Sequence, residues 1–207
     1  MSLPPQESWR TVEVSAERLD GWIDRFALRH GLLVAAADDG AVQLTAADGA
    51  VARVHLPSGA VAGNRDELVA AAAAFDSFGL VLVRRGGYAV GRVEGRRLAQ
   101  SRCGTRYVQG KTKAGGWSQQ RFARRRANQA DAVAQAAAKA FAEVLGATQR
   151  ILVCGGDRAL VRHALELSGA DKWRTARWLT VPDPRRKVLE DAVDGARAAR
   201  IALNHLA

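Results

Sequence analysis

The segment GKTKAGGWSQQRFARRR spans Gly110–Arg126 and joins a set of predicted strands to the longest predicted helix. It has paired glycines, two consecutive glutamines and a basic end, and it contains no acidic residue. The wider window Gly95–Ala130 holds ten Lys or Arg residues and no Asp or Glu, whereas the whole chain has 31 basic and 21 acidic residues. Without these ten, the chain has 21 of each, so this window carries the entire formal net charge of +10. Such dense positive charge predicts a polyanionic partner, and a solvated basic helix face is the alternative.

The composition limits the class of protein. A chain of 207 residues, 48% of them hydrophobic, is long enough for one large globular domain or for one domain with a small addition. Cys103 and Cys154 form no C-x-x-C pair, and the four histidines lack metal-ligand spacing, so we expect neither a disulfide nor a metal site. There is no long apolar run and no signal-peptide pattern, so we expect a cytoplasmic protein without a membrane span.

Residues 1–62 have the pattern of a small N-terminal α/β unit. Trp9–Val14 alternates like a strand, and Ser15 can cap a helix that continues to about Arg29. Ala41–Thr45 and Val51–Leu56 are then predicted to form two strands joined by a hairpin turn at Ala47-Asp48-Gly49. Nothing in this unit indicates chemistry, because its tryptophans have the spacing of core residues.

Residues 63–207 form the second predicted domain. A helix starts at Asn64, with Glu67 in the capping-box position, and ends at Gly79. Three strands follow in an antiparallel meander, with tight turns between them. The predicted strands are Leu80–Arg84, Tyr88–Val93 and Arg97–Cys103.

The third strand runs into the basic segment, and a long alanine-rich helix, Ser118–Leu145, follows it. Strand Ile151–Cys154, a helix to about Ser168, strand Arg177–Val181 and a final helix to about Leu203 complete the order. Three antiparallel strands, helix, strand, helix, strand and helix is the order of a ribonuclease H-like fold. We therefore predict a mixed five-stranded sheet flanked by helices, which by itself says little about function.

The glycine-rich loop has the chemistry of a probe that enters a narrow site. Gly115 and Gly116 lack side-chain bulk and permit unusual backbone angles. Gln119 and Gln120 can donate and accept hydrogen bonds but do not titrate, so either could orient water or bind an oxyanion. A linker with incidental glutamines is the alternative.

Four arginines lie at the start of the long helix, where positive charge opposes the helix dipole. Contacts with phosphates would compensate for this cost, so we predict phosphate binding by this cluster rather than a merely solvated face. The cluster consists of Arg121, Arg124, Arg125 and Arg126.

Two other patterns of candidate binding residues favour neither a phosphate loop nor a metal centre. Gly155-Gly156-Asp157 lies between a strand and a helix like a phosphate loop, but Asp157 as an ordinary N-cap explains it better. The aspartates form no recognisable set of ligands for two-metal nuclease chemistry. These aspartates are Asp20, Asp24, Asp38, Asp39 and Asp183.

The basic segment resembles the region around the Gly-Gly-Gln loop of the eukaryotic and archaeal class-one peptide release factor. That family follows its loop with a serine and an Arg-Phe-Ala-Arg helix start, which match Ser118 and Arg121–Arg124. The preceding strands and Tyr107 resemble the Vms/ANKZF-type release factors, in particular their bacterial, mainly actinobacterial branch. The resemblance covers roughly Gly79–Leu203 and implies a domain like the middle domain of the release factor.

The sequence departs from the family pattern at the catalytic position. In an alignment without gaps, the family's catalytic glutamine falls on Trp117, which cannot replace it. Gln119 or Gln120 is the available substitute, and we favour Gln119 because it lies further from the regular helix.

The resemblance implies a peptidyl-tRNA hydrolase that frees nascent chains on stalled large ribosomal subunits without a cofactor or metal. Its partners would be ribosomal RNA and peptidyl-tRNA, and we expect a monomer. A nuclease that cuts the tRNA 3′ end and a non-enzymatic RNA-binding module are the alternatives. The residues expected to hold RNA are Arg102, Arg106, Lys111, Lys113, Arg121, Arg124, Arg125 and Arg126.

Overall fold

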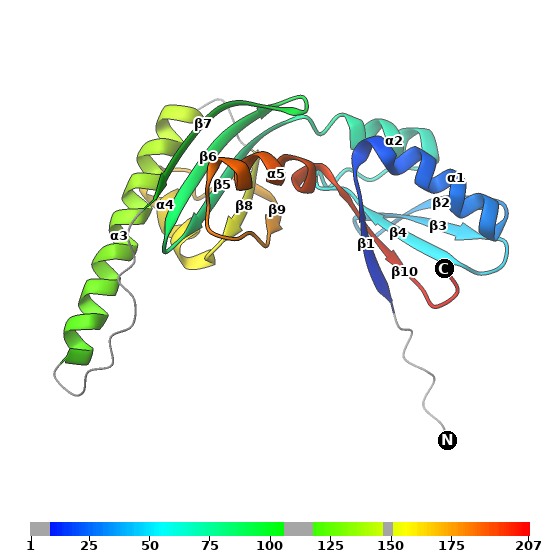
Figure 1. Cartoon of the computed structure of the whole chain (residues 1–207). Helices are drawn as coiled ribbons and strands as arrows, with labels where there is room; N and C mark the ends of the chain where they lie inside the picture. Colours follow the sequence, from blue (N-terminus) through cyan, green and yellow to red (C-terminus); the bar gives the residue numbers. More distant parts are fainter. Residues whose placement is uncertain (1–8, 106–117, 147–150) are drawn as a thin grey trace, which may run out of the picture. The chain divides into compact units, whose positions relative to one another are not determined.

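The computed structural model describes residues 9–105, 118–146 and 151–207, apart from the side chains of 118–123, 125 and 126. The chain forms two compact units (Figure 1). One contains the residues up to Asp76 together with Arg197–Ala207, and the other contains Ser77–Ala196. The first unit is therefore discontinuous in sequence and larger than the N-terminal unit expected over residues 1–62.

The first unit contains a five-stranded antiparallel sheet of order β1-β10-β4-β3-β2. Its strands are β1 (Arg10–Val14), β2 (Leu33–Asp38), β3 (Ala41–Ala46), β4 (Val51–His55) and β10 (Ala199–Leu203). Strand β10 pairs with β1 on one side and with β4 on the other, so the end of the chain completes the N-terminal sheet.

Two helices pack on one face of this sheet (Figure 1). A 3-10 turn (Ala16–Arg18) leads into α1 (Leu19–His30), which ends at Gly31 with a φ of 91°. Helix α2 (Arg65–Ala73) begins at Asn64, whose side chain accepts a 2.9 Å hydrogen bond from a backbone N–H of the first turn. The shared core includes Leu19, Ile23, Phe26, Val42, Leu44, Leu68 and Ile201.

The second unit contains a mixed sheet of order β7-β6-β5-β8-β9. Its strands are β5 (Ser77–Arg84), β6 (Gly87–Glu94), β7 (Arg97–Thr105), β8 (Ile151–Gly156) and β9 (Arg174–Leu179). Strands β5, β6 and β7 form an antiparallel meander, whereas β8 runs parallel to β5 and β9 parallel to β8. The predicted meander and five-stranded mixed sheet are confirmed.

Helices cover both faces of this second sheet. Helices α3 (Ser118–Val144) and α4 (Arg158–Leu167) pack on one face, while α5 (Arg186–Arg197) packs on the other, with Leu189 against Gly91 of β6. Alanines along α3 let it lie close to the strands. No helix among the described residues is long and apolar enough to cross a membrane.

Three expectations about secondary structure were wrong. The helix after Asn64 ends at Ala73, so Phe78 and Gly79 belong to β5. Strand β2 was not expected, because its three consecutive alanines carry no β-sheet signal. The final helix ends at Arg197 rather than near Leu203, and the last segment is strand β10 of the first unit.

Candidate RNA-binding site at strand β7 and helix α3

The predicted site residues fall into three groups. Arg106, Lys111, Lys113, Gly115 and Gly116 lie outside the described residues. Gln119 and Gln120 lie in the first turn of α3, and Arg121, Arg125 and Arg126 lie further along it. For these five residues the structure describes the backbone only. The structure describes the side chains of Arg102 on β7 and Arg124 on α3, both of which are exposed.

Strand β7 is the edge strand that enters the basic segment, and close backbone packing fixes its last residues. Gly104 pairs with Tyr88 of β6, and a Cβ added at Gly104 would lie 2.6 Å from the Tyr88 ring. The tyrosine therefore lies directly over the backbone of β7. The packing fixes the point from which the chain leaves the sheet.

Helix α3, on the far side of the segment, is anchored by its C-terminal half. Val133, Ala137 and Phe141 are buried against the sheet, and the ring of Phe141 meets Trp173 edge-on with centroids 5.1 Å apart. Gly146 ends the helix with a φ of 54° and donates its N–H to the carbonyl oxygen of Phe141. The apolar anchor and the basic start thus lie at opposite ends of one helix.

Strand β7 and helix α3 are joined by polar contacts around Glu143. The Arg102 guanidinium lies 3.2 Å from the Glu143 carboxylate, and Gln100 Nε2 donates to the Glu143 carbonyl oxygen at 3.3 Å. The side chain of Arg102 remains 59% exposed, so it can still face RNA, but its charge is partly neutralised. The role of Glu143 could not be predicted from the sequence, because contacts between a strand and a distant helix leave no local signal.

Asp131, the first acidic residue after the basic window, binds side chains of helices α3 and α4. Asp131 on α3 lies 2.9 Å from Nε2 of His163 on α4 and accepts a 2.8 Å hydrogen bond from Gln135. Arg124 lies about two helical turns before Asp131. It is exposed and forms no ion pair among the described residues. The start of α3 therefore retains a positive charge that can attract phosphate.

The two cysteines are not poised as nucleophiles at neutral pH. Desolvation raises the pKa of the Cys103 thiol on β7. Burial raises the pKa of Cys154 on β8 to about 11, with a smaller opposing effect from Thr175. Because the thiolate is the reactive form, neither residue suits covalent catalysis.

The Gly155-Gly156-Asp157 pattern is a helix start, as expected. Asp157 Oδ1 accepts hydrogen bonds of 3.0 and 3.3 Å from the N–H groups of Ala159 and Leu160. A pocket of about 630 Å³ opens beside it, at the carboxyl ends of β5 and β8, lined in part by Arg84 and Trp178. Arg84 is bound there to the carbonyl oxygen of Val181 at 2.8 Å. The described residues include no group of three His, Cys, Asp or Glu side chains that could hold a metal ion.

Comparison with known proteins identifies a family that this chain resembles. The model of the Actinobacteria/chloroflexi VLRF1 release factor family matches residues 76–202, which include the basic window and the whole second sheet. No curated protein matches the chain.

Proposed function

The chain belongs to the Actinobacteria/chloroflexi VLRF1 release factor family, and from this we propose that it hydrolyses peptidyl-tRNA on large ribosomal subunits. The observation that carries the proposal is the place of the basic segment in the matched domain. It connects the exposed end of β7 with a helix whose apolar half is anchored and whose start is basic. Such a helix can follow RNA phosphates while the loop ahead of it reaches a reacting ester.

We further propose that the second unit has the ribonuclease H-like fold of a release-factor middle domain. The strand order β7-β6-β5-β8-β9, with its three antiparallel strands followed by two parallel ones, supports this assignment. The positions of α3 and α4 on one face and α5 on the other also agree with it.

In the proposed reaction, Gln119 or Gln120 positions a water molecule against the ester carbonyl carbon. Glutamine does not titrate, so it orients the water and donates a hydrogen bond, while an N–H near the Gly115-Gly116 pair binds the oxyanion. The water oxygen bonds to the carbonyl carbon and the bond to the ribose oxygen breaks. One water is consumed, and the products are a peptide carboxyl group and a tRNA with a free ribose hydroxyl. The protonated thiols of Cys103 and Cys154 leave no competing nucleophile among the described cysteines.

The direct test is to incubate the purified protein with large subunits that carry labelled peptidyl-tRNA. We expect peptide release with intact tRNA, and we expect Gln119→Ala or Gln120→Ala to slow release by about 10²–10³ without weakening subunit binding. Gly115→Ala and Gly116→Ala should also slow release, because a Cβ restricts the backbone of the loop.

Each rival function gives a different result in the same assay. A tRNA that lacks its terminal nucleotides would identify a nuclease. Binding without any turnover would identify an RNA-binding module. If both glutamine variants and the double variant release peptide at the wild-type rate, the glutamine assignment is wrong.

A further inference from the structure

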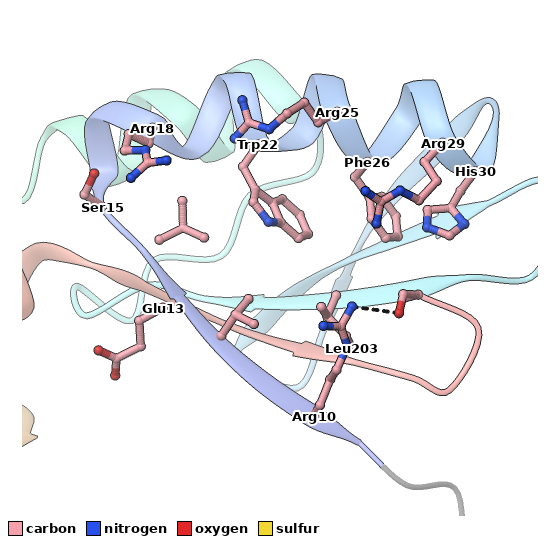
Figure 2. A pocket seen from close by; sticks show the side chains of 13 residues that line it. Arg10, Glu13, Ser15, Arg18, Trp22, Arg25, Phe26, Arg29, His30 and Leu203 are labelled. Carbon is pink, nitrogen blue, oxygen red and sulfur yellow. Dashed lines mark hydrogen bonds between the residues drawn. The ribbon is translucent and has the colours of Figure 1, made fainter.

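The first unit contains a pocket of about 460 Å³ between α1, β1 and the end of β10 (Figure 2). Four of its thirteen lining residues are arginines, and Glu13 is the one acidic residue among them. Arg10 is already bound to the backbone oxygen of Ala207 at 2.9 Å. The other three arginines, Arg18, Arg25 and Arg29, lie along α1 and the turn that precedes it.

These three arginines lie on the same side of the helical segment, because their spacings of seven and four residues correspond to whole turns. All three are exposed, and none of them forms an ion pair among the described residues. Elsewhere in the same unit arginines are neutralised: Arg65 lies 2.6 Å from both Asp20 and Asp24. The pocket therefore has an excess of positive charge.

Aromatic rings form a second row beside the arginines. Trp22 stacks on Phe26 with ring centroids 5.3 Å apart and an interplanar angle of 12°, and Phe26 lies 4.7 Å from the His30 ring. Phe26 and His30 are buried, but Trp22 remains partly exposed on the pocket wall. Figure 2 shows these rings on the side of α1 that faces the sheet. The ring of Trp22 is thus available for stacking, and the buried rings of Phe26 and His30 support it.

A buried polar atom in this pocket lacks a partner. The His30 side chain is only 8% exposed, its Nδ1 lies 2.8 Å from Oδ2 of Asp48, and its Nε2 has no hydrogen-bond partner among the described residues. A carboxylate can only accept, so Nδ1 donates to Asp48 and the ring orientation is fixed. An unsatisfied buried nitrogen is costly. Because Nδ1 carries the proton, Nε2 is an acceptor, and a bound ligand with a hydroxyl group, such as the 2′-hydroxyl of a ribose, would satisfy it.

We propose that this pocket binds single-stranded RNA, with phosphates held by Arg18, Arg25 and Arg29 and a base stacked on Trp22. Arginines that flank an exposed aromatic ring are the means by which proteins hold single strands. The site would be a second RNA contact, separate from the basic window of α3 and independent of the release chemistry. An extended peptide could instead pair with β1, the edge strand of the sheet, but backbone pairing would use neither the guanidinium groups nor Trp22.

The test uses the full chain and a fluorescein-labelled decauridylate that contains 4-thiouridine. The variant Arg25→Glu/Arg29→Glu should lower the salt slope of RNA binding by about 1.4, since each lost phosphate contact on a single strand removes about 0.7. The control Arg162→Glu/Lys172→Glu has the same change in charge at exposed residues of the second unit that do not line the pocket, and it should leave the slope unchanged. Trp22→Leu should weaken RNA binding about fivefold or more, with circular dichroism to confirm that the fold survives.

Photocrosslinking locates the contact directly. We expect a crosslinked peptide that contains Trp22 in the wild type and in the control, and none in Arg25→Glu/Arg29→Glu. Crosslinks confined to the second unit, or equal losses of affinity in the two double variants, would overturn the proposal. Equally tight binding of poly-glutamate at this pocket would also overturn it in favour of an acidic peptide. None of these readouts depends on peptide release, so the outcome is distinguishable from a failure of the proposed hydrolase function.

Discussion

Gly156 occupies a backbone position that no other residue suits. Its φ is +97°, and an added Cβ would lie 2.2 Å from the carbonyl oxygen of Val83 on the paired strand β5. Gly95 also has a positive φ, +65°, but nothing lies within 4 Å of an added Cβ there. Gly95→Ala should therefore cost about 1–2 kcal/mol of backbone strain. Gly156→Ala should cost at least about 2 kcal/mol more, because β5 must also shift.

Urea unfolding of the two variants and the wild type measures this difference. Equal losses of stability in Gly95→Ala and Gly156→Ala would mean that β5 and β8 separate at no cost, which would contradict the packing seen here. The sequence predicted the N-cap role of Asp157 correctly. It could not predict that a Cβ has no room at Gly156, because the crowding comes from the parallel pairing of β5 and β8, which are far apart in the chain.

Cys154 should make the stability of the protein depend on alkaline pH. Its pKa rises from an ordinary value of 9.0 to about 11 through burial, so the unfolded thiol loses its proton before the folded one. The resulting stabilisation, about 2–3 kcal/mol, is fully present below pH 9 and is lost as the pH rises to about 11. The difference in unfolding free energy between the wild type and Cys154→Ala should shrink by this amount across that range. Parallel curves for the two proteins would show that the thiol is not shielded.

At the scale of the element, the start of α3 should determine RNA affinity without taking part in the chemistry. Arg124→Glu/Arg125→Glu should weaken binding to large subunits and lower the salt slope by about 1–2, since each phosphate contact contributes about 0.7–0.9. Saturating protein should partly restore the release rate, in contrast to the glutamine variants. A matched control is Arg162→Glu/Lys172→Glu, which reverses two exposed charges of the same unit outside the basic window. If both double variants bind alike, α3 presents only a solvated face.

The sequence predicted elements well where local signals agreed. The meander β5–β7, the helices α3 and α4 and the glycine after α3 followed from turn residues, apolar periodicity and caps. It was wrong where alanine dominated, as in β2 and β10, since alanine favours helices and these strands are specified by their neighbours in the sheet. It also placed Phe78 in a helix, although β5 buries that ring completely. The ion pair between Arg102 and Glu143 depends on tertiary packing and had no signal in the sequence.

At the scale of the whole molecule, the second unit is inserted in the sequence between the two parts of the first unit. Residues up to Asp76 and from Arg197 onward form one compact unit, whereas the matched family region extends from 76 to 202 and so includes most of β10. The sequence of the first unit indicated no chemistry, because Trp22 and Phe26 have the spacing of core residues. The spacing of Arg18, Arg25 and Arg29 places them on one side of a helix, which was visible in the sequence. It indicates a binding site only once the structure shows that β1 and the end of β10 form the other wall of the pocket.

The closing strand offers the last test. Ile201 is fully buried in the core of the first unit, whereas its neighbour Arg200 is exposed on the other face of β10. Ile201→Asp places a charge in an apolar core, where it lacks a partner, and should cost several kcal/mol. Arg200→Asp should cost about 0.5 kcal/mol or less, as surface changes usually do. Hydrogen exchange followed by mass spectrometry should then show lost protection in β1, β3 and β4 of Ile201→Asp, with β5 and β8 still protected. Equal loss of protection in both sheets, or none in either, would mean that β10 does not hold the first unit together.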